Sequence, residues 1–235
     1  MEKMLVIFDC DGVLVDSEGL AAQALASSIM DIGYDITPEE TQEMFLGYSL
    51  DMVINSLKTD LNLTVGDTFK SRYLTELHSH MYKNLTPIPE IHQTISRVKH
   101  IDRVKNICVA SNGELETVRI SLQITSLISF FGNNIFTAND VLYGKPNPDL
   151  FLYTAEQMRF APSQCIVVED SLLGVKAAIA AGMSVFGYIE EQRSIKENLH
   201  SFCSAGAKTF VKMNQLPLLI ENMQPTPKLK KRPGP

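Results

Sequence analysis

Two aspartates separated by a single residue follow the first apolar segment of the chain. Residues 5–8 predict a strand that is buried on both faces, as at the centre of a parallel sheet. A carboxylate is costly to bury unless a cation or hydrogen bonds satisfy it. We therefore expect Asp9 and Asp11 at the carboxyl end of this strand, where open α/β sheets bind ligands. Gly12 then lets the backbone turn sharply. The pattern indicates a functional site.

Three later segments of the chain also lead into polar residues. An apolar run at 106–110 is followed by Ser111-Asn112-Gly113, and a run at 165–168 is followed by Glu169 and Asp170. Between them, a weaker strand leads through a loop to Lys145. Because parallel strands place their carboxyl ends at one edge of a sheet, we expect carboxylates, a hydroxyl, amides and one ammonium to converge there.

Such a set of groups suits phosphoryl transfer. Carboxylates are ligands for Mg²⁺, which also keeps waters or substrate phosphate oxygens. Ser111, the amides around Asn112 and the Lys145 ammonium can bind phosphate oxygens. Asp9 can attack phosphorus as a nucleophile. Asp11 can then act as general acid for the leaving oxygen and as base for water, while a metal prevents repulsion between nucleophile and phosphate.

The hydrophobic pattern predicts two kinds of structure around these motifs. Residues 17–86 predict only helices, at 17–32, from 37 onward, at 50–61 and at 65–85. From residue 87, strands at 106–110, 135–137, 165–168, 184–188 and 208–211 alternate with helices at 114–127, 148–158 and 171–181. This alternation predicts a parallel sheet with helices on both faces.

The predicted fold class is therefore α/β, a doubly wound, Rossmann-like parallel sheet with an inserted all-helical cap. We expect residues 1–16 and 87–223 to form the core and residues 17–86 to form the cap. The stretch 224–235, which is rich in proline and carries Lys228, Lys230, Lys231 and Arg232, predicts a disordered basic tail.

Composition limits the partners. The chain has 235 residues, 45% of them hydrophobic, and a net charge of −6, so it lacks the general basic surface of a nucleic-acid-binding protein. No apolar run approaches the roughly 20 residues that span a bilayer, and the first apolar stretch is too short for a signal peptide. The four cysteines lack metal-type spacing, and three of them sit in or beside apolar strands, which indicates small buried thiols in a reducing compartment. We expect a cytoplasmic monomer that binds a small phosphorylated metabolite, without nucleic-acid or membrane partners.

Taken in order, the motifs resemble those of the haloacid dehalogenase-like hydrolase superfamily. The matching stretches are residues 9–18, Ser111-Asn112, Lys145-Pro146 and Glu169-Asp170-Ser171, and none departs from the family pattern. The resemblance covers the core, and the helical insertion looks like the family's first-type cap. Within the superfamily, the chain is most similar to the branch of sugar-phosphate phosphatases and β-phosphoglucomutase-like enzymes.

The resemblance implies a role for each motif residue. Asp9 would be the nucleophile, and Asp11 the acid/base whose main-chain carbonyl binds Mg²⁺. Asp170 would bind Mg²⁺ together with Glu169, which acts directly or through water. Ser111 and Asn112 would hold the phosphate, and Lys145 would orient it. Read without the resemblance, Glu169 and Asp170 could instead cap the helix that begins near Ser171.

Particular residues distinguish between the reactions known in this superfamily. Dehalogenases and phosphonate hydrolases lack the aspartate found here as Asp11. Mutases carry a histidine early in the first cap helix and an arginine in the cap turn, and residues 16–26 and 47–50 contain neither. We therefore predict a phosphatase that hydrolyses a small phosphomonoester, a sugar or sugar-acid phosphate, with Mg²⁺ and an aspartyl-phosphate intermediate. The alternatives are β-phosphoglucomutase-like phosphoryl transfer and a non-catalytic binding protein of the same fold.

Assignments within the cap are less direct. Asp16, Ser17 and Glu18 are interpreted as hinge and helix-capping residues rather than as chemical groups. For contacts with the leaving group, the predicted residues are Tyr48, Ser49, Lys70 and Arg72.

Overall fold

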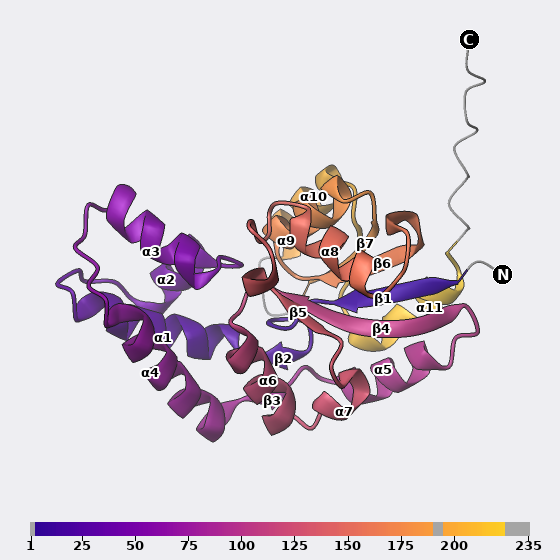
Figure 1. The fold of residues 1–235 in the computed structure, drawn as a ribbon, viewed down its shortest axis with the longest axis horizontal. Helices are drawn as coiled ribbons and strands as arrows, with labels where there is room; N and C mark the ends of the chain where they lie inside the picture. The colour runs from indigo at the N-terminus through magenta and orange to yellow at the C-terminus, as the bar shows by residue number, and fades with distance from the viewer. Residues whose placement is uncertain (1–2, 190–194, 224–235) are drawn as a thin grey trace, which may run out of the picture.

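A parallel sheet carries the strand ends that hold the polar motifs. The computed structural model describes residues 3–189 and 195–223. Its main sheet has six strands in the order β5-β4-β1-β6-β7-β8, and all neighbouring pairs are parallel (Figure 1). The strands are β1 (Met4–Phe8), β4 (Val104–Ser111), β5 (Ile135–Thr137), β6 (Cys165–Glu169), β7 (Ser184–Tyr188) and β8 (Lys208–Phe210). The strands that follow β1 in sequence, β4 and β5, lie on one side of it, and the later strands β6, β7 and β8 lie on the other. This change of direction places the ligand crevice at the carboxyl end of β1.

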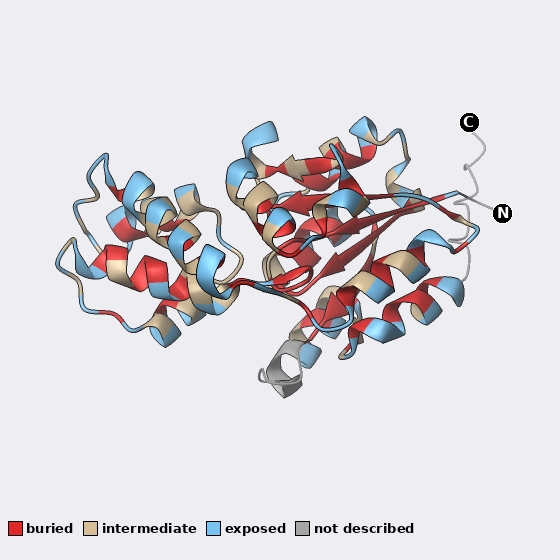
Figure 2. Ribbon diagram, turned by 90° about the horizontal axis from the view of Figure 1, so that it is seen from below, coloured by how far each residue is buried: buried red, intermediate tan, exposed pale blue. Residues whose placement is uncertain are grey.

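Alternate residues of β1 face opposite sides of the sheet. Val6 and Phe8 belong to one apolar cluster, and Leu5 and Ile7 to another. The first cluster includes residues of α5 (Ile91–Lys99), α6 (Leu115–Ile124), α7 (Ile128–Phe131) and α11 (Leu216–Glu221). The second includes residues of α8 (Asp149–Gln157), α9 (Leu172–Ala180) and α10 (Ile195–Ala205). Figure 2 shows the buried strands between helices whose outer faces are exposed. The doubly wound core is confirmed.

Four helices between the first and second core strands form a separate apolar cluster. They are α1 (Glu18–Met30), α2 (Pro38–Phe45), α3 (Leu50–Thr59) and α4 (Phe69–Asn84). The start predicted at Thr37 is confirmed, because its hydroxyl accepts from the Glu40 amide (3.2 Å) and the Glu40 carboxylate accepts from the Thr37 amide (2.8 Å). In Figure 1 these helices lie together at one end of the molecule, beside the core.

A small antiparallel pair joins the cap to the core. β2 (Val15–Asp16) pairs with β3 (Thr86–Pro87), so the segments that leave and re-enter the core lie side by side. The sequence showed no sign of this pair, since two residues are too few to carry a period. The exact division at residues 16/17 and 86/87 stays a prediction, although both junctions adjoin these strands.

Other differences from the sequence prediction are local. Helices α5, α10 and α11 were not predicted, and short 3₁₀ turns occur at Ala138–Asp140, Pro162–Gln164 and Met213–Gln215. The helix predicted over 114–127 is confirmed as α6 but ends at Ile124, before Ser126, whose φ is +58°; the separate short helix α7 then follows. Cys10, Cys108 and Cys165 are buried as expected, whereas Cys203 is exposed.

Two further expectations meet the limits of the described chain. Within residues 3–189 and 195–223, no helix combines the length and apolar character needed to cross a bilayer. The basic tail predicted at 224–235 lies outside the described residues.

Candidate active site

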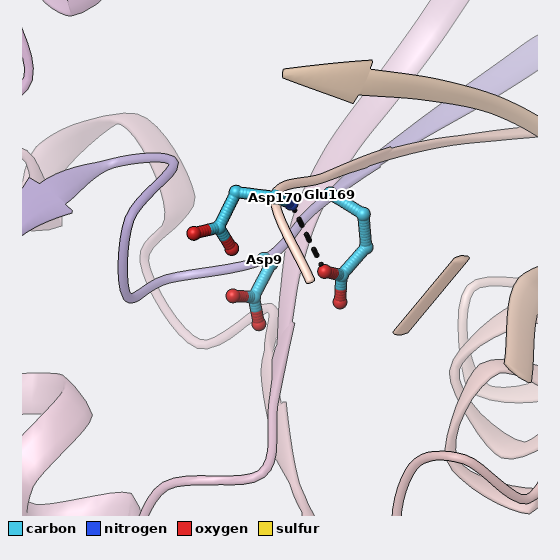
Figure 3. Close-up of side chains that lie close together, drawn as sticks. All are labelled: Asp9, Glu169 and Asp170. Carbon is cyan, nitrogen blue, oxygen red and sulfur yellow. Dashed lines mark hydrogen bonds between the residues drawn. The ribbon is translucent and has the colours of Figure 1, made fainter. Parts of the chain in front are cut away.

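Three buried carboxylates meet where β1 and β6 end. Phe8 pairs with Val168, and the Asp9 amide donates to the Val168 carbonyl at 3.0 Å, which sets Asp9 beside the end of β6. Carboxylate oxygens of Asp9, Glu169 and Asp170 lie within 4.8 Å of one another. Figure 3 shows the three side chains converging from the two strand ends. The register of the sheet therefore brings these predicted site residues together.

Lys145 enters this group from the loop that follows β5. Its Nζ lies 2.6 Å from Asp9 Oδ1 and 2.5 Å from Glu169 Oε1, and the residue is buried. Burial opposes the charge of this ammonium, but the two carboxylates outweigh burial and hold the Lys145 pKa above its usual range. Lys145 is thus a permanently charged member of the site.

The carboxylates carry more negative charge than one ammonium can balance. Burial, reinforced by the charges of Glu169 and Asp11 and opposed by Lys145, raises the pKa of Asp9 to about 8. Burial and the neighbouring carboxylates also hold the pKa of Asp170 well above its usual range. Removing carboxylates from water and crowding them together both favour their neutral forms. A further cation at this point would relieve both effects.

The donor set fits a divalent cation that prefers oxygen ligands, such as Mg²⁺. Gly12 permits the close approach that builds it, because a Cβ there would lie 2.0 Å from Asp170 Oδ2, and the residue has a φ of +73°. Glu169 is already engaged at both oxygens. Its Oε1 contacts Lys145, and its Oε2 accepts from the amides of Asp170 (3.1 Å) and Ser171 (3.1 Å) and from the Ser171 hydroxyl (3.0 Å).

These bonds also answer whether Glu169 and Asp170 simply cap α9. Ser171 is the N-cap residue, since its hydroxyl accepts from the Gly174 amide at 3.1 Å. Glu169 accepts from two amides that precede the helix while it contacts Lys145. The Glu169 carboxylate therefore binds the backbone just before α9 and also takes part in the charged cluster.

Two hydroxyls orient Asp11. The Ser17 hydroxyl donates to Asp11 Oδ1 at 2.6 Å, and the Ser111 hydroxyl donates to Asp11 Oδ2 at 3.4 Å. Ser17 occupies the N-cap position of α1, as interpreted, but its side chain makes no capping hydrogen bond to that helix. Its hydroxyl is drawn instead to a carboxylate six positions earlier. Ser17 is a site residue that the sequence interpretation missed.

The side chain of Asn112 is occupied by main-chain groups. Its Nδ2 donates to the carbonyls of Gly47 and Lys145, both at 3.0 Å, and its Oδ1 accepts from the Lys145 amide at 2.9 Å. We therefore expect Asn112 to contact phosphate through the backbone of this turn rather than through its side chain. The Ser111 hydroxyl accepts from the Gly113 amide at 2.9 Å, which holds the turn in place.

A cavity of about 170 Å³ lies between the core and the cap. Its core wall includes Asp9, Asp11, Ser111, Asn112, Lys145 and Asp170, and its cap wall comes from α1, α2, α3, α4 and the turn before α3. The lining residues of α4 are Tyr73, Leu74, Leu77 and Met81, which lie three or four positions from another member and share one face of the helix. The helical spacing of these residues could have identified this face of α4 from the sequence, although it does not reveal that the face lines a cavity.

Only one of the four residues predicted for leaving-group contacts lines the cavity. Tyr48 does so, whereas Ser49, Lys70 and Arg72 do not. Ser49 is the N-cap of α3 and accepts from the Met52 amide at 3.3 Å. Each of the two cations is held by a carboxylate, Lys70 by Glu114 of the cavity lining at 2.6 Å and Arg72 by Asp31, which does not line the cavity.

The chain is similar to proteins of known family. A family model described as haloacid dehalogenase-like hydrolase matches residues 6–188. The chain is 29% identical to the 6-phosphogluconate phosphatase of Escherichia coli, over 91% of this chain and 93% of that protein. It is 28% identical to the phosphorylated carbohydrates phosphatase of Thermotoga maritima, over 90% and 95%. A solved HAD family hydrolase from Deinococcus radiodurans, with bound phosphate and sodium, has a TM-score of 0.71 and 26% identity, covering 93% of this chain and 95% of that one.

Proposed function

The chain belongs to the haloacid dehalogenase-like hydrolase family, and from this premise we propose that it uses Asp9 and Mg²⁺ to hydrolyse a small phosphorylated carbohydrate. The family and its named phosphatase relatives make the protein a phosphatase. The observation that carries the proposal is the contact of Asp9 with Lys145 at 2.6 Å, in the wall of a cavity between core and cap. This contact places the candidate nucleophile, Asp9, beside the ammonium group that would bind phosphate.

In the first step, a carboxylate oxygen of Asp9 attacks phosphorus and the bond from phosphorus to the leaving oxygen breaks. Asp11 donates a proton to that oxygen. The Ser17 and Ser111 hydroxyls hold Asp11 in a fixed orientation toward the cavity that Asp9 also lines. In the second step, water attacks the phosphoryl group on Asp9, and Asp11 accepts the proton from that water. Phosphate leaves and both carboxyl groups return to their starting states.

Binding of the phosphoryl group falls to the core wall. Lys145 supplies positive charge, the Ser111 hydroxyl supplies a polar contact, and the Asn112 amide is the expected backbone donor, because the Gly113 amide already donates to Ser111. The residues that would hold Mg²⁺ are Asp9, Asp170 and the Asp11 carbonyl, with Glu169 acting through water because both its oxygens are engaged. When bound, the ion would offset the charge between nucleophile and phosphate.

The leaving group would occupy the cap side of the cavity. Two relatives are named for phosphatase activity on 6-phosphogluconate and on phosphorylated carbohydrates, which supports a carbohydrate phosphate. Among the described residues that line the cavity, no histidine or arginine occurs. A mutase needs groups that hold a second phosphate and activate a sugar hydroxyl, so water is the favoured acceptor here.

Two assays test the proposal. Purified protein should hydrolyse p-nitrophenyl phosphate with added Mg²⁺ and lose this activity in excess EDTA, and a panel of phosphorylated sugars, polyols and sugar acids should identify the substrate. With β-glucose 1-phosphate and a trace of the 1,6-bisphosphate, inorganic phosphate should be released. Equal turnover in EDTA would refute the metal-dependent mechanism. Stoichiometric conversion to glucose 6-phosphate would show a mutase instead.

A further inference from the structure

Tyr73 stands in the cap wall opposite the catalytic carboxylates. It lies on α4 and lines the same cavity as Asp9 and Asp11. The side chain packs against both the core cluster that includes Val6 and Phe8 and the separate cap cluster. The ring is therefore held between the two parts of the protein, at a fixed place above the site.

Most other polar groups of the cap wall already have partners within the protein. The Thr41 hydroxyl donates to the Thr37 carbonyl at 2.8 Å, and the Gln42 amide donates to Glu18 at 3.1 Å. On the adjoining helix α6 and at its start, further lining residues are engaged in the same way. Glu114 binds Lys70 at 2.6 Å, and Thr117 shares a hydrogen bond of 2.9 Å with His78.

The Tyr73 hydroxyl differs from these groups, because it has no hydrogen-bond partner among the described residues. Burial, reinforced by the charge of Asp11, holds the Tyr73 pKa above its usual range, so the group stays protonated. A protonated phenol is a hydrogen-bond donor, and a partly buried donor without a partner is unfavourable. Tyr48 also lines the cavity, but 38% of that residue is exposed. Solvent can satisfy its hydroxyl at the surface, whereas the hydroxyl of the half-buried Tyr73 opens into the cavity, where a bound ligand can take the place of solvent.

We propose that the Tyr73 hydroxyl donates a hydrogen bond to a hydroxyl of the leaving group and thereby selects phosphate esters of polyols or sugars. The inference rests on the proposed function, which places the phosphoryl group on the core wall and the leaving group under α4. A site built around such a bond discriminates against an analogue that lacks the hydroxyl, because the protein donor is then left unpaired. Tyr73 would thus determine specificity.

The test compares Tyr73→Phe with wild type on three substrates. Ribitol 5-phosphate carries hydroxyls on its leaving group, whereas pentyl phosphate and p-nitrophenyl phosphate carry none. The variant should lose about three- to tenfold in kcat/KM for the polyol ester and keep its rates on the other two. Tyr34→Phe is the matched control, because Tyr34 packs in the cap cluster without lining the cavity. It should leave all three rates unchanged.

The other outcomes refute the inference in distinguishable ways. Equal losses on all three substrates would show that Tyr73 only supports packing, and unchanged rates on the polyol ester would show that its hydroxyl does not contact the leaving group. Thermal unfolding of both variants identifies a loss caused by misfolding, which would affect every substrate alike. If wild type hydrolyses none of the three esters, the proposed function itself fails, and this inference fails with it.

Discussion

The carboxamide of Asn112 binds both main-chain groups of Lys145. Its Oδ1 accepts from the Lys145 amide at 2.9 Å, and its Nδ2 donates to the Lys145 carbonyl at 3.0 Å. The same Nδ2 donates to the Gly47 carbonyl of the cap, also at 3.0 Å. One side chain therefore fixes the backbone that carries the site's ammonium and ties it to the cap. Asn112 is a positioning residue.

Replacing Asn112 should disturb Lys145 without removing its charge. Asn112→Ala removes three hydrogen bonds, so we expect kcat to fall on the order of tenfold while KM changes less. The matched control is Asn147→Ala in the loop that carries Lys145, where Nδ2 donates to the Gly144 carbonyl at 3.3 Å and to no other group of the described residues. Steady-state kinetics with p-nitrophenyl phosphate measure both variants. Equal effects from the two substitutions would remove the positioning role.

Replacing Asp9 and replacing Asp11 should reduce turnover to different extents. Asp9→Asn should abolish turnover, because an amide cannot form the acyl-phosphate. Asp11→Asn should lower kcat by about 10²- to 10⁴-fold, the usual contribution of general acid–base catalysis. An ester with a good leaving group, such as p-nitrophenyl phosphate, should suffer less than an alkyl phosphate from loss of the acid. Near-normal turnover by the Asp9 variant would defeat the mechanism.

Gly12 allows a matched comparison with Gly33. Both have positive φ, +73° and +89°, so the backbone strain of Ala alone should destabilise the fold by about 1 kcal/mol at either position. A Cβ at Gly12 would collide with Asp170, whereas nothing lies within 4 Å of a Cβ at Gly33. Gly12→Ala should therefore raise the half-saturating Mg²⁺ concentration and Gly33→Ala should not. A magnesium titration of activity tests this. Equal half-saturating concentrations in the two variants would show that Gly12 has no influence on the metal site.

Mg²⁺ affinity should increase with pH. The pKa of Asp9 is raised to about 8 in the absence of metal, so the carboxyl is protonated in a growing fraction of molecules below that pH. A cation must displace this proton, and binding weakens on the order of tenfold per unit as pH falls below about 8. The raised pKa of Asp170 acts in the same direction. Calorimetric titration between about pH 6 and pH 8, without substrate, measures this, and a constant affinity would contradict it.

The core and its charged motifs could be predicted because both depend on local patterns. The run before Asp9 is apolar at every position, and parallel topology then places the strand end at the site. Helix α5 was missed although its apolar residues keep a helical period. Its start carries no usual signal, since Glu90 has a φ of +64° and makes no side-chain capping bond.

Contacts between the cap and the core could not be predicted in the same way. Tyr73 and Ser17 acquire their roles only when α4 and the segment after β2 lie over the strand ends, and no local pattern encodes that packing. Lys70 and Arg72 were predicted to contact the leaving group, but carboxylates at the ends of other helices bind them instead. Their partners lie more than forty positions away in sequence.

The pairing of β2 with β3 has a consequence for how the cap was acquired and how it can be replaced. For the core, residues between the two strands behave as a loop whose ends are already closed, so their number adds little entropic cost to folding. Any folded unit with adjacent termini could be spliced there while β1 and the strand ends keep their register. The same scaffold could thus receive different leaving-group pockets by exchange of one continuous stretch of chain, and p-nitrophenyl phosphate hydrolysis would report whether the core survived each exchange.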